Sequence, residues 1–150
     1  AGGGQTRISI TNVLSRTYGL AAYEGDVKHI YNMLMINDAL PATKTEVYCT
    51  KSDNQAGVEL EIYESRSTDP RMDVESRQPI TVVDMSFQRS VPRGTSIITT
   101  LALDNSGILH IVAEEQLYHS KLDTTFQLSN EMTGEEMQNA LTRMSSANVE

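Results

Sequence analysis

Apolar and polar side chains alternate through most of the chain, and the clearest case lies within residues 44–64. Val58, Leu60 and Ile62 recur at every second position, so they share one face of an extended strand. A second alternating segment precedes them, and a polar loop at residues 53–57 connects the two. This arrangement predicts a hairpin with one buried face, and loops held by a rigid sheet are frequent sites of binding residues.

Shorter alternating or β-branched segments predict further strands. They cover residues 13–23, 30–36, 79–87, 96–103, 108–113 and 120–128, while residues 7–12 form either a strand or an extended connector. The sequence DNSG at residues 104–107 predicts a tight turn and therefore a second hairpin. We expect a mobile loop at residues 24–26, a solvated connection at residues 65–79 and a bulge or bend near Val83.

The pattern changes near the C-terminus, where apolar residues recur at helical spacing. Thr133 and Glu136 form a capping box, and apolar residues from Met137 to Met144 follow at positions i, i+3, i+4 and i+7. These residues predict an amphipathic helix that follows the strands. The expected fold is mainly β, a two-layer antiparallel β-sandwich of about eight strands with a C-terminal α-helix.

Length and charge narrow the function classes. The 150 residues fit one domain, and a net charge of -8 repels nucleic-acid backbones, so no nucleic-acid partner is expected. No apolar run reaches the roughly 20 residues that cross a bilayer, so no membrane partner is expected either. The single cysteine, Cys49, is predicted to be a half-buried strand residue, and it fits a reducing compartment, with a cytoplasmic location expected.

Candidate catalytic groups do not form a motif. His29, His110 and His119 lack the paired spacing of a zinc site, and His110 is expected to be a structural residue within a strand. Carboxylates at residues 69–75 are expected to be solvated surface charges, and no nucleophile elbow, phosphate loop or dinucleotide fingerprint occurs. The chain is therefore not expected to be an enzyme, and this domain is expected to bind no metal or cofactor.

Five short motifs follow one another in a fixed order. They are NVLSRTYG at residues 12–19, LPATKTEVYCTKSDNQAGVELEIYE at residues 40–64, VPRG at residues 91–94, DNSGILHIVA at residues 104–113 and MTGEEM at residues 132–137. In this order they resemble the peptide-binding domain of the DnaK-type seventy-kilodalton heat-shock chaperones, of which the chain would be a divergent member. The resemblance implies a flexible tail and linker remnant at residues 1–12, a β-sandwich peptide-binding domain at 13–129 and the first lid helix at 130–150.

By the same resemblance, six residues line a channel for an extended peptide. Val58 matches the central pocket position, which receives one aliphatic side chain. Leu20, Tyr48 and Leu60 match the other pocket-lining positions. Tyr23 and Lys51 match the pair that arches over the peptide backbone. Alternation alone favours plain sandwich core for Val58, Leu60 and Tyr48, so both interpretations stand at this point.

The resemblance implies a chaperone module of the stress response that binds extended hydrophobic segments of unfolded proteins. It also implies an ATPase domain in the full-length chain, which would bind ATP and regulate peptide affinity, and J-domain co-chaperones as partners. Binding of the chain's own tail in the groove of a neighbouring molecule would give self-association. The alternative is a β-sandwich adhesion or carbohydrate-binding domain, which the absence of tryptophan disfavours because such domains use exposed aromatic platforms.

Overall fold

The computed structural model describes residues 12–128, and this range contains nine β-strands and no α-helix. The strands are β1 (Thr17–Glu24), β2 (Val27–Leu34), β3 (Ala42–Cys49), β4 (Gln55–Ser65), β5 (Arg71–Asp73), β6 (Thr81–Val91), β7 (Ser96–Leu103), β8 (Ile108–Glu115) and β9 (Lys121–Gln127). The helix predicted at residues 130–150 and most of the tail predicted at residues 1–12 lie outside the described residues.

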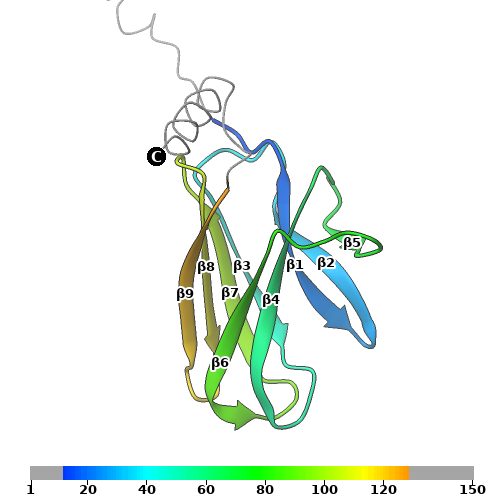
Figure 1. The fold of residues 1–150 in the computed structure, drawn as a ribbon, viewed down its shortest axis with the longest axis vertical. Helices are drawn as coiled ribbons and strands as arrows, with labels where there is room; N and C mark the ends of the chain where they lie inside the picture. Colours follow the sequence, from blue (N-terminus) through cyan, green and yellow to red (C-terminus); the bar gives the residue numbers. More distant parts are fainter. Residues whose placement is uncertain (1–11, 129–150) are drawn as a thin grey trace, which may run out of the picture.

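The strands form two antiparallel sheets that pack face to face (Figure 1). One sheet has the order β5-β2-β1-β4-β6, and the other has the order β3-β7-β8-β9. In Figure 1 the four-stranded sheet lies on the left, and the β1–β2 hairpin lies away from it on the right. The predicted two-layer antiparallel β class is therefore confirmed for residues 12–128, with nine strands in place of about eight.

The core forms because alternating apolar residues of the two sheets face each other. Leu101 and Leu103 of β7 and Leu109 and Ile111 of β8 are almost completely buried, and the register pairs them across the two strands. Leu20 of β1 joins the same apolar cluster from the facing sheet. Burial of one such side chain contributes about 1.5–3 kcal/mol, so this cluster is the main source of stability.

β3 and β4 do not form the predicted hairpin. β3 pairs with β7 along its whole length, from Ala42 opposite Leu103 to Cys49 opposite Ser96. β4 pairs instead with β1 and β6, so the loop between β3 and β4 crosses from one sheet to the other. Alternation located both strands, but it does not identify the partner of a strand.

The connection between β4 and β6 was expected to be solvated, but it contains a short strand. β5 pairs with β2, where Met72 is the partner of Ile30. The hydroxyl of Thr17 in β1 donates a hydrogen bond to the carbonyl oxygen of Ser67, at 2.7 Å. Ile30 is fully buried although it lies outside the main apolar cluster. The connection therefore covers part of the outer face of the β1–β2 hairpin.

Two further local expectations have different outcomes. The connection expected at residues 24–26 is a two-residue turn at Gly25 and Asp26, and Gly25 adopts a φ of 65° that permits a tight reversal. The irregularity in the β4–β6 pairing lies beside Gln55 and Gly57, not near Val83.

Cys49 is exposed rather than half-buried. It is the last residue of β3, which is an edge strand of its sheet. The residue before it, Tyr48, packs against the apolar cluster of the core, so strand alternation directs Cys49 to the opposite face of the strand. The sequence pattern gave the strand but not its position at the edge of the sheet.

The predicted second hairpin, β7–β8, is confirmed. One carboxylate oxygen of Asp104 accepts hydrogen bonds from the backbone N–H groups of Ile108 at 3.1 Å and Ser106 at 2.8 Å. These bonds, that of Ile108 foremost, lower the pKa of the Asp104 carboxyl. The second oxygen lies 3.3 Å from Nε2 of His110, so this histidine has the structural role expected of it.

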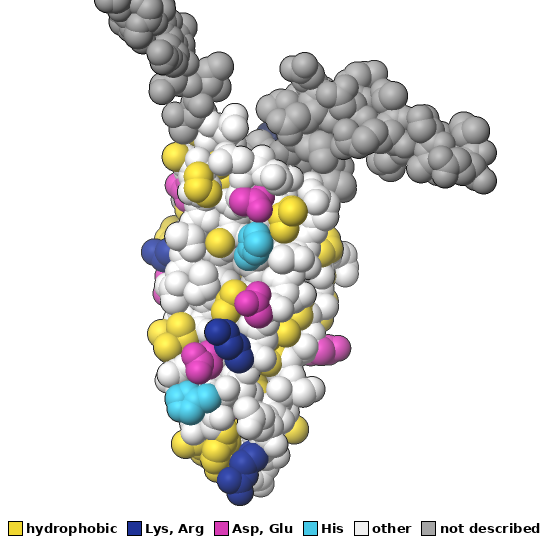
Figure 2. All heavy atoms as spheres, turned by 90° about the vertical axis from the view of Figure 1, so that its left-hand side faces the viewer, with side chains coloured by type: hydrophobic (Ala, Val, Ile, Leu, Met, Phe, Trp, Pro, Cys, Tyr) yellow, Lys and Arg dark blue, Asp and Glu magenta, His cyan; other side chains and the backbone are white. Residues whose placement is uncertain are grey.

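The outer face of the four-stranded sheet has a mixed surface. Figure 2 shows hydrophobic, acidic and basic side chains interspersed over this side, without a broad patch of one kind. The most exposed large apolar side chains of β3 and β7 are Val47 and Ile98, which lie opposite each other in the pairing of these two strands. Within residues 12–128, no helix has the length and apolar character required to span a membrane.

Candidate binding groove

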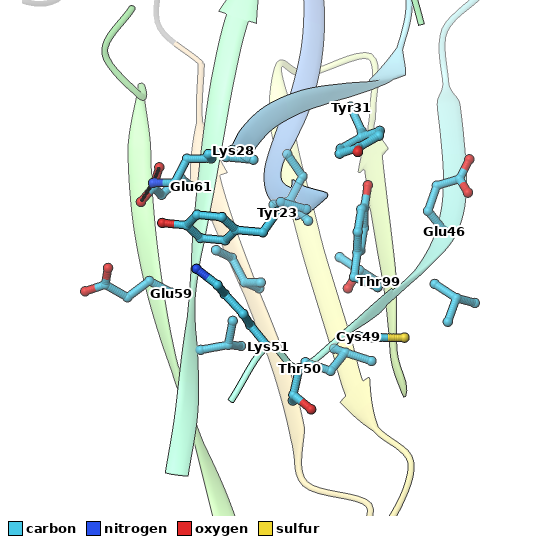
Figure 3. Close-up of a pocket in the computed structure, with 18 of the residues that line it drawn as sticks. Tyr23, Lys28, Tyr31, Glu46, Cys49, Thr50, Lys51, Glu59, Glu61 and Thr99 are labelled. Atoms are coloured by element: carbon cyan, nitrogen blue, oxygen red, sulfur yellow. Dashed lines mark hydrogen bonds and ion pairs between the residues drawn. The ribbon is translucent and has the colours of Figure 1, made fainter. Parts of the chain in front are cut away.

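A groove of about 1530 Å³ opens between the β1–β2 hairpin and strands β3, β4 and β7 (Figure 3). All six residues that the resemblance identified lie in its walls. They are Leu20, Tyr23, Tyr48, Lys51, Val58 and Leu60. They come from three strands and one loop, so residues distant in the sequence converge on a single concave surface.

The inner wall of the groove is apolar. Leu20 of β1 and Leu60 of β4 are 2% and 4% exposed and belong to the main apolar cluster. Val58 is only half-buried, since it packs against this cluster and also lines the groove. Val58 thus contributes to the sandwich core and also faces the groove.

Tyr48 projects from the inner face of the edge strand β3, where its backbone partner is Ile97 of β7. Its ring makes an edge contact with the ring of Tyr31 in β2, with centroids 6.2 Å apart, and this contact bridges the two sheets. Among the described residues, the buried phenolic oxygen of Tyr48 has no hydrogen-bond partner. Burial, followed by the nearby Glu46 carboxylate and Tyr31, raises the pKa of the Tyr48 phenol.

Tyr23 and Lys51 are in contact at the mouth of the groove. The Lys51 ammonium lies 3.7 Å from the centroid of the Tyr23 ring, which is a cation–π geometry. Figure 3 shows Lys51 extending from the loop after β3 towards the ring of Tyr23. The two residues that the resemblance matched to an arch thus meet across the groove, with Tyr23 remaining 48% exposed.

The loop that carries Lys51 is held by side-chain hydrogen bonds. The side-chain oxygen of Gln55 accepts from the backbone N–H groups of Lys51 at 3.0 Å and Ser52 at 3.1 Å. The hydroxyl of Thr50 donates to the carbonyl oxygen of Pro92 at 2.8 Å. Because the backbone at Lys51 is fixed in this way, its long side chain starts from a defined position.

Sequence reasoning missed two further residues of the groove, Lys28 and Glu61. The Lys28 ammonium lies 3.0 Å from both carboxylate oxygens of Glu61 and 5.6 Å from the centroid of the Tyr23 ring. The hydrogen bond with Glu61 raises the pKa of Lys28 against the opposing effect of burial. In Figure 3 the Tyr23 ring lies between Lys28 and Lys51. This cluster depends on the placement of β2, β1 and β4 side by side in one sheet, which no sequence signal reveals.

The groove offers a ligand an apolar inner wall and a charged rim. Glu46 and Glu59 contribute carboxylates to its lining, and Lys44 and Arg93 contribute cationic groups. Within the described part of the chain, no three His, Cys, Asp or Glu side chains gather closely enough to hold a metal ion.

The comparisons with known proteins agree on one family. A family model described as Hsp70 protein matches residues 2–150. Heat shock cognate 70 kDa protein 3 of Dictyostelium discoideum is 29% identical over 86 residues, which are 57% of this chain and 13% of that protein. Chaperone protein DnaK of Deinococcus radiodurans is 29% identical over 117 residues, which are 73% of this chain and 16% of that protein. The chain thus spans a small part of these relatives, and it belongs to the Hsp70 protein family.

Proposed function

We propose that this chain is the peptide-binding part of an Hsp70 chaperone and that its groove binds extended apolar segments of unfolded polypeptides. The observation that carries the proposal is the convergence of the six predicted residues on one groove. An extended peptide would satisfy its backbone through main-chain hydrogen bonds, and Val58 would receive one aliphatic side chain. The contact between Lys51 and Tyr23 would enclose the bound backbone.

The proposal assigns no catalytic step to this chain. ATP would bind an ATPase domain of the longer protein and shift this domain between two states that differ in peptide affinity. J-domain co-chaperones would act through that ATPase domain. The coupling is a property of the two domains together, so the isolated chain should bind peptide without responding to ATP.

The charge of the chain supports a preference among apolar peptides. Its net charge is -8, whereas acidic and cationic side chains are balanced in the groove lining, so the preference would come from the overall charge of the chain. Apolar segments flanked by Lys or Arg would therefore associate faster than segments flanked by acidic residues, and added salt would reduce the difference.

Fluorescence anisotropy tests the proposal. The probe is a labelled Leu-rich peptide with basic flanks, compared with a polar acidic peptide of the same length. Wild type should bind the first peptide and not the second. Val58→Phe should weaken binding by about tenfold or more, because the larger ring fills the space of the guest side chain.

Val82→Phe is the matched control, because Val82 is an exposed strand residue outside the groove lining. This control should bind peptide as wild type does. The proposal is wrong if wild type does not bind the basic Leu-rich peptide, or if Val58→Phe, shown to be folded by circular dichroism, binds it with unchanged affinity.

A further inference from the structure

Two hydroxyl groups in the lining of the groove are buried and unpaired. Among the described residues, neither the phenolic oxygen of Tyr48 nor Oγ1 of Thr99 has a hydrogen-bond partner. Thr99 is 0% exposed and lies on the inner face of β7, between the buried Ile97 and Leu101. A buried hydroxyl without a partner is unfavourable, because it has lost its hydrogen bonds to water.

The hydroxyls of the other buried residues of 12–128 all have partners. They are Thr17 with Ser67, Tyr18 with Glu64, Thr50 with Pro92, Tyr63 with Glu61, Ser65 with Ser67, Thr95 with Pro92 and Ser120 with Gln88. His29 has the third unpaired buried atom, and this nitrogen lies 3.3 Å from a carboxylate oxygen of Asp73. The two unpaired hydroxyls, those of Tyr48 and Thr99, therefore both belong to residues that line the groove.

We propose that Tyr48 and Thr99 form a polar subsite that selects a serine or threonine at one position of an otherwise apolar peptide. This inference rests on the proposed function and specifies its substrate class. A side-chain hydroxyl has one donor and two acceptor positions, so it can donate to one of these oxygens and accept from the other. An apolar side chain in the same place would leave both hydroxyls unpaired.

The positions of the two residues make the subsite reachable. Tyr48 is half-buried on an edge strand and lines the groove, and a change in its χ1 angle would carry its hydroxyl towards the groove, whereas rotation of the ring about χ2 leaves the hydroxyl in place. The hydroxyl of Thr99 is carried by β7, the neighbour of β3 in the same sheet. Both residues line the groove from neighbouring strands, so a guest side chain that enters between the sheets at this point would lie beside both of them.

A peptide scan tests the subsite. Each apolar position of the labelled Leu-rich peptide with basic flanks is replaced in turn by Val and by Thr, which have nearly the same shape. At one position the Thr peptide should bind wild type about tenfold more tightly than the Val peptide. At the other positions the Val peptide should bind at least as tightly as the Thr peptide, because a hydroxyl is costly in an apolar pocket.

The double substitution Tyr48→Phe with Thr99→Val removes both hydroxyls and keeps the side-chain shapes. This variant should lose the preference for Thr, so the ratio of its affinities for the Thr and Val peptides should fall to about one or below at that position. The control is Thr100→Val, because Thr100 faces outward and bonds the hydroxyl of Thr45 at 2.8 Å. The control should keep the preference.

The thermal stability of the free protein gives a second readout. Because the two hydroxyls are unpaired in the empty groove, their removal should leave the melting temperature unchanged or raise it. A clear fall would mean that they are already paired in the free protein, for example by a trapped water, and would overturn the subsite. Tighter binding of Val than Thr at every position would overturn it too, whereas failure of all the peptides to bind would overturn the proposed function itself.

Discussion

The Lys51 ammonium lies 3.7 Å from the centre of the Tyr23 ring, and the two residues approach from different sheets. Tyr23 belongs to β1 of the five-stranded sheet, while Lys51 follows β3 of the four-stranded sheet. The contact is therefore a bridge between the sheets at the mouth of the groove, and its strength depends on a positive charge.

Lys51→Met should loosen the grip on bound peptide. Met has an unbranched side chain of similar length but no positive charge. The substitution therefore removes the cation–π attraction, which is worth about 0.5–1 kcal/mol at an exposed site. Peptide dissociation, followed by stopped-flow fluorescence, should become about two- to fivefold faster. Lys51→Arg should dissociate at the wild-type rate, because Arg retains the charge.

The same contact has a signature in the free protein. Ring currents from Tyr23 should shift the terminal methylene protons of Lys51 upfield in the NMR spectrum, and Tyr23→Leu should return them to ordinary values. Ordinary shifts in wild type would contradict the bridge whether or not the protein binds peptide.

Glu115 should make the stability depend on pH. It is 0% exposed, and its carboxylate accepts hydrogen bonds from the backbone N–H groups of Leu117, Tyr118 and Ser120. Burial by itself would raise the pKa of Glu115, but these three bonds outweigh it and lower the pKa. Since the folded pKa lies below the unfolded value, the stabilisation is complete above the unfolded pKa of about 4.3 and is lost as the pH falls through the folded pKa.

Glu115→Gln should lower the free energy of unfolding at pH 7 by about 1.5–3 kcal/mol, because it weakens hydrogen bonds to a charged group. Urea denaturation at several pH values between neutrality and acid should show a shallower pH dependence than in wild type. Glu59→Gln, at an exposed position, is the control and should change stability little. Equal acid sensitivity of wild type and Glu115→Gln would contradict the assignment.

Thr17→Val should be strongly destabilising although the two side chains have the same shape. The buried hydroxyl of Thr17 donates to the carbonyl oxygen of Ser67 at 2.7 Å and accepts from the N–H of Ile36 at 2.9 Å. Each partner left unpaired costs about 1–3 kcal/mol in the free energy of unfolding, measured by urea denaturation. Thr43→Val on the exposed side of β3 should have almost no effect. Similar losses in the two variants would show that the Thr17 bonds do not secure the connection to β1.

Gly57→Ala should disturb the start of β4. A methyl group at Gly57 would lie 2.5 Å from the backbone carbonyl oxygen of Met85, so the two strands would have to separate. The expected loss is about 1–3 kcal/mol, measured by chemical denaturation. Ala56→Ser, at the exposed neighbouring position, should be tolerated. Wild-type stability of Gly57→Ala would mean that β6 yields at this point without cost.

The sequence predicted every strand except β5, but it did not predict which strands pair with one another. Alternation located β4, β7 and β9 because each has one face in the core, and it failed to place β3 beside β7 because pairing is decided by long-range contacts. The short strand β5 was missed because Arg71 and Asp73 are exposed and only Met72 turns inward, so no period is visible. A three-residue segment of this kind is recognised only from the strand it pairs with.

The residues of the candidate groove likewise fall into those that were predicted from the sequence and those that were missed. Val58 and Leu60 were found because the resemblance marks aligned positions on one strand. Lys28 and Glu61 were missed, since their contact depends on how two strands far apart in the chain are brought together in space. The unpaired state of Tyr48 and Thr99 is likewise invisible in a sequence, because it is defined by the absence of a neighbour.

The covering of β2 by β5 has a mechanical consequence. β5 pairs with β2 at three positions around the fully buried Ile30, whereas Tyr23 and Val27 beside the turn are 48% and 56% exposed. The β1–β2 hairpin is therefore held by main-chain pairing with β5 around Ile30, while its turn end is joined to the rest of the sandwich by side-chain contacts, Lys28 with Glu61 and Tyr23 with Lys51. The mouth of the groove thus depends on side-chain contacts, whereas its base depends on the backbone hydrogen bonds of the sheet.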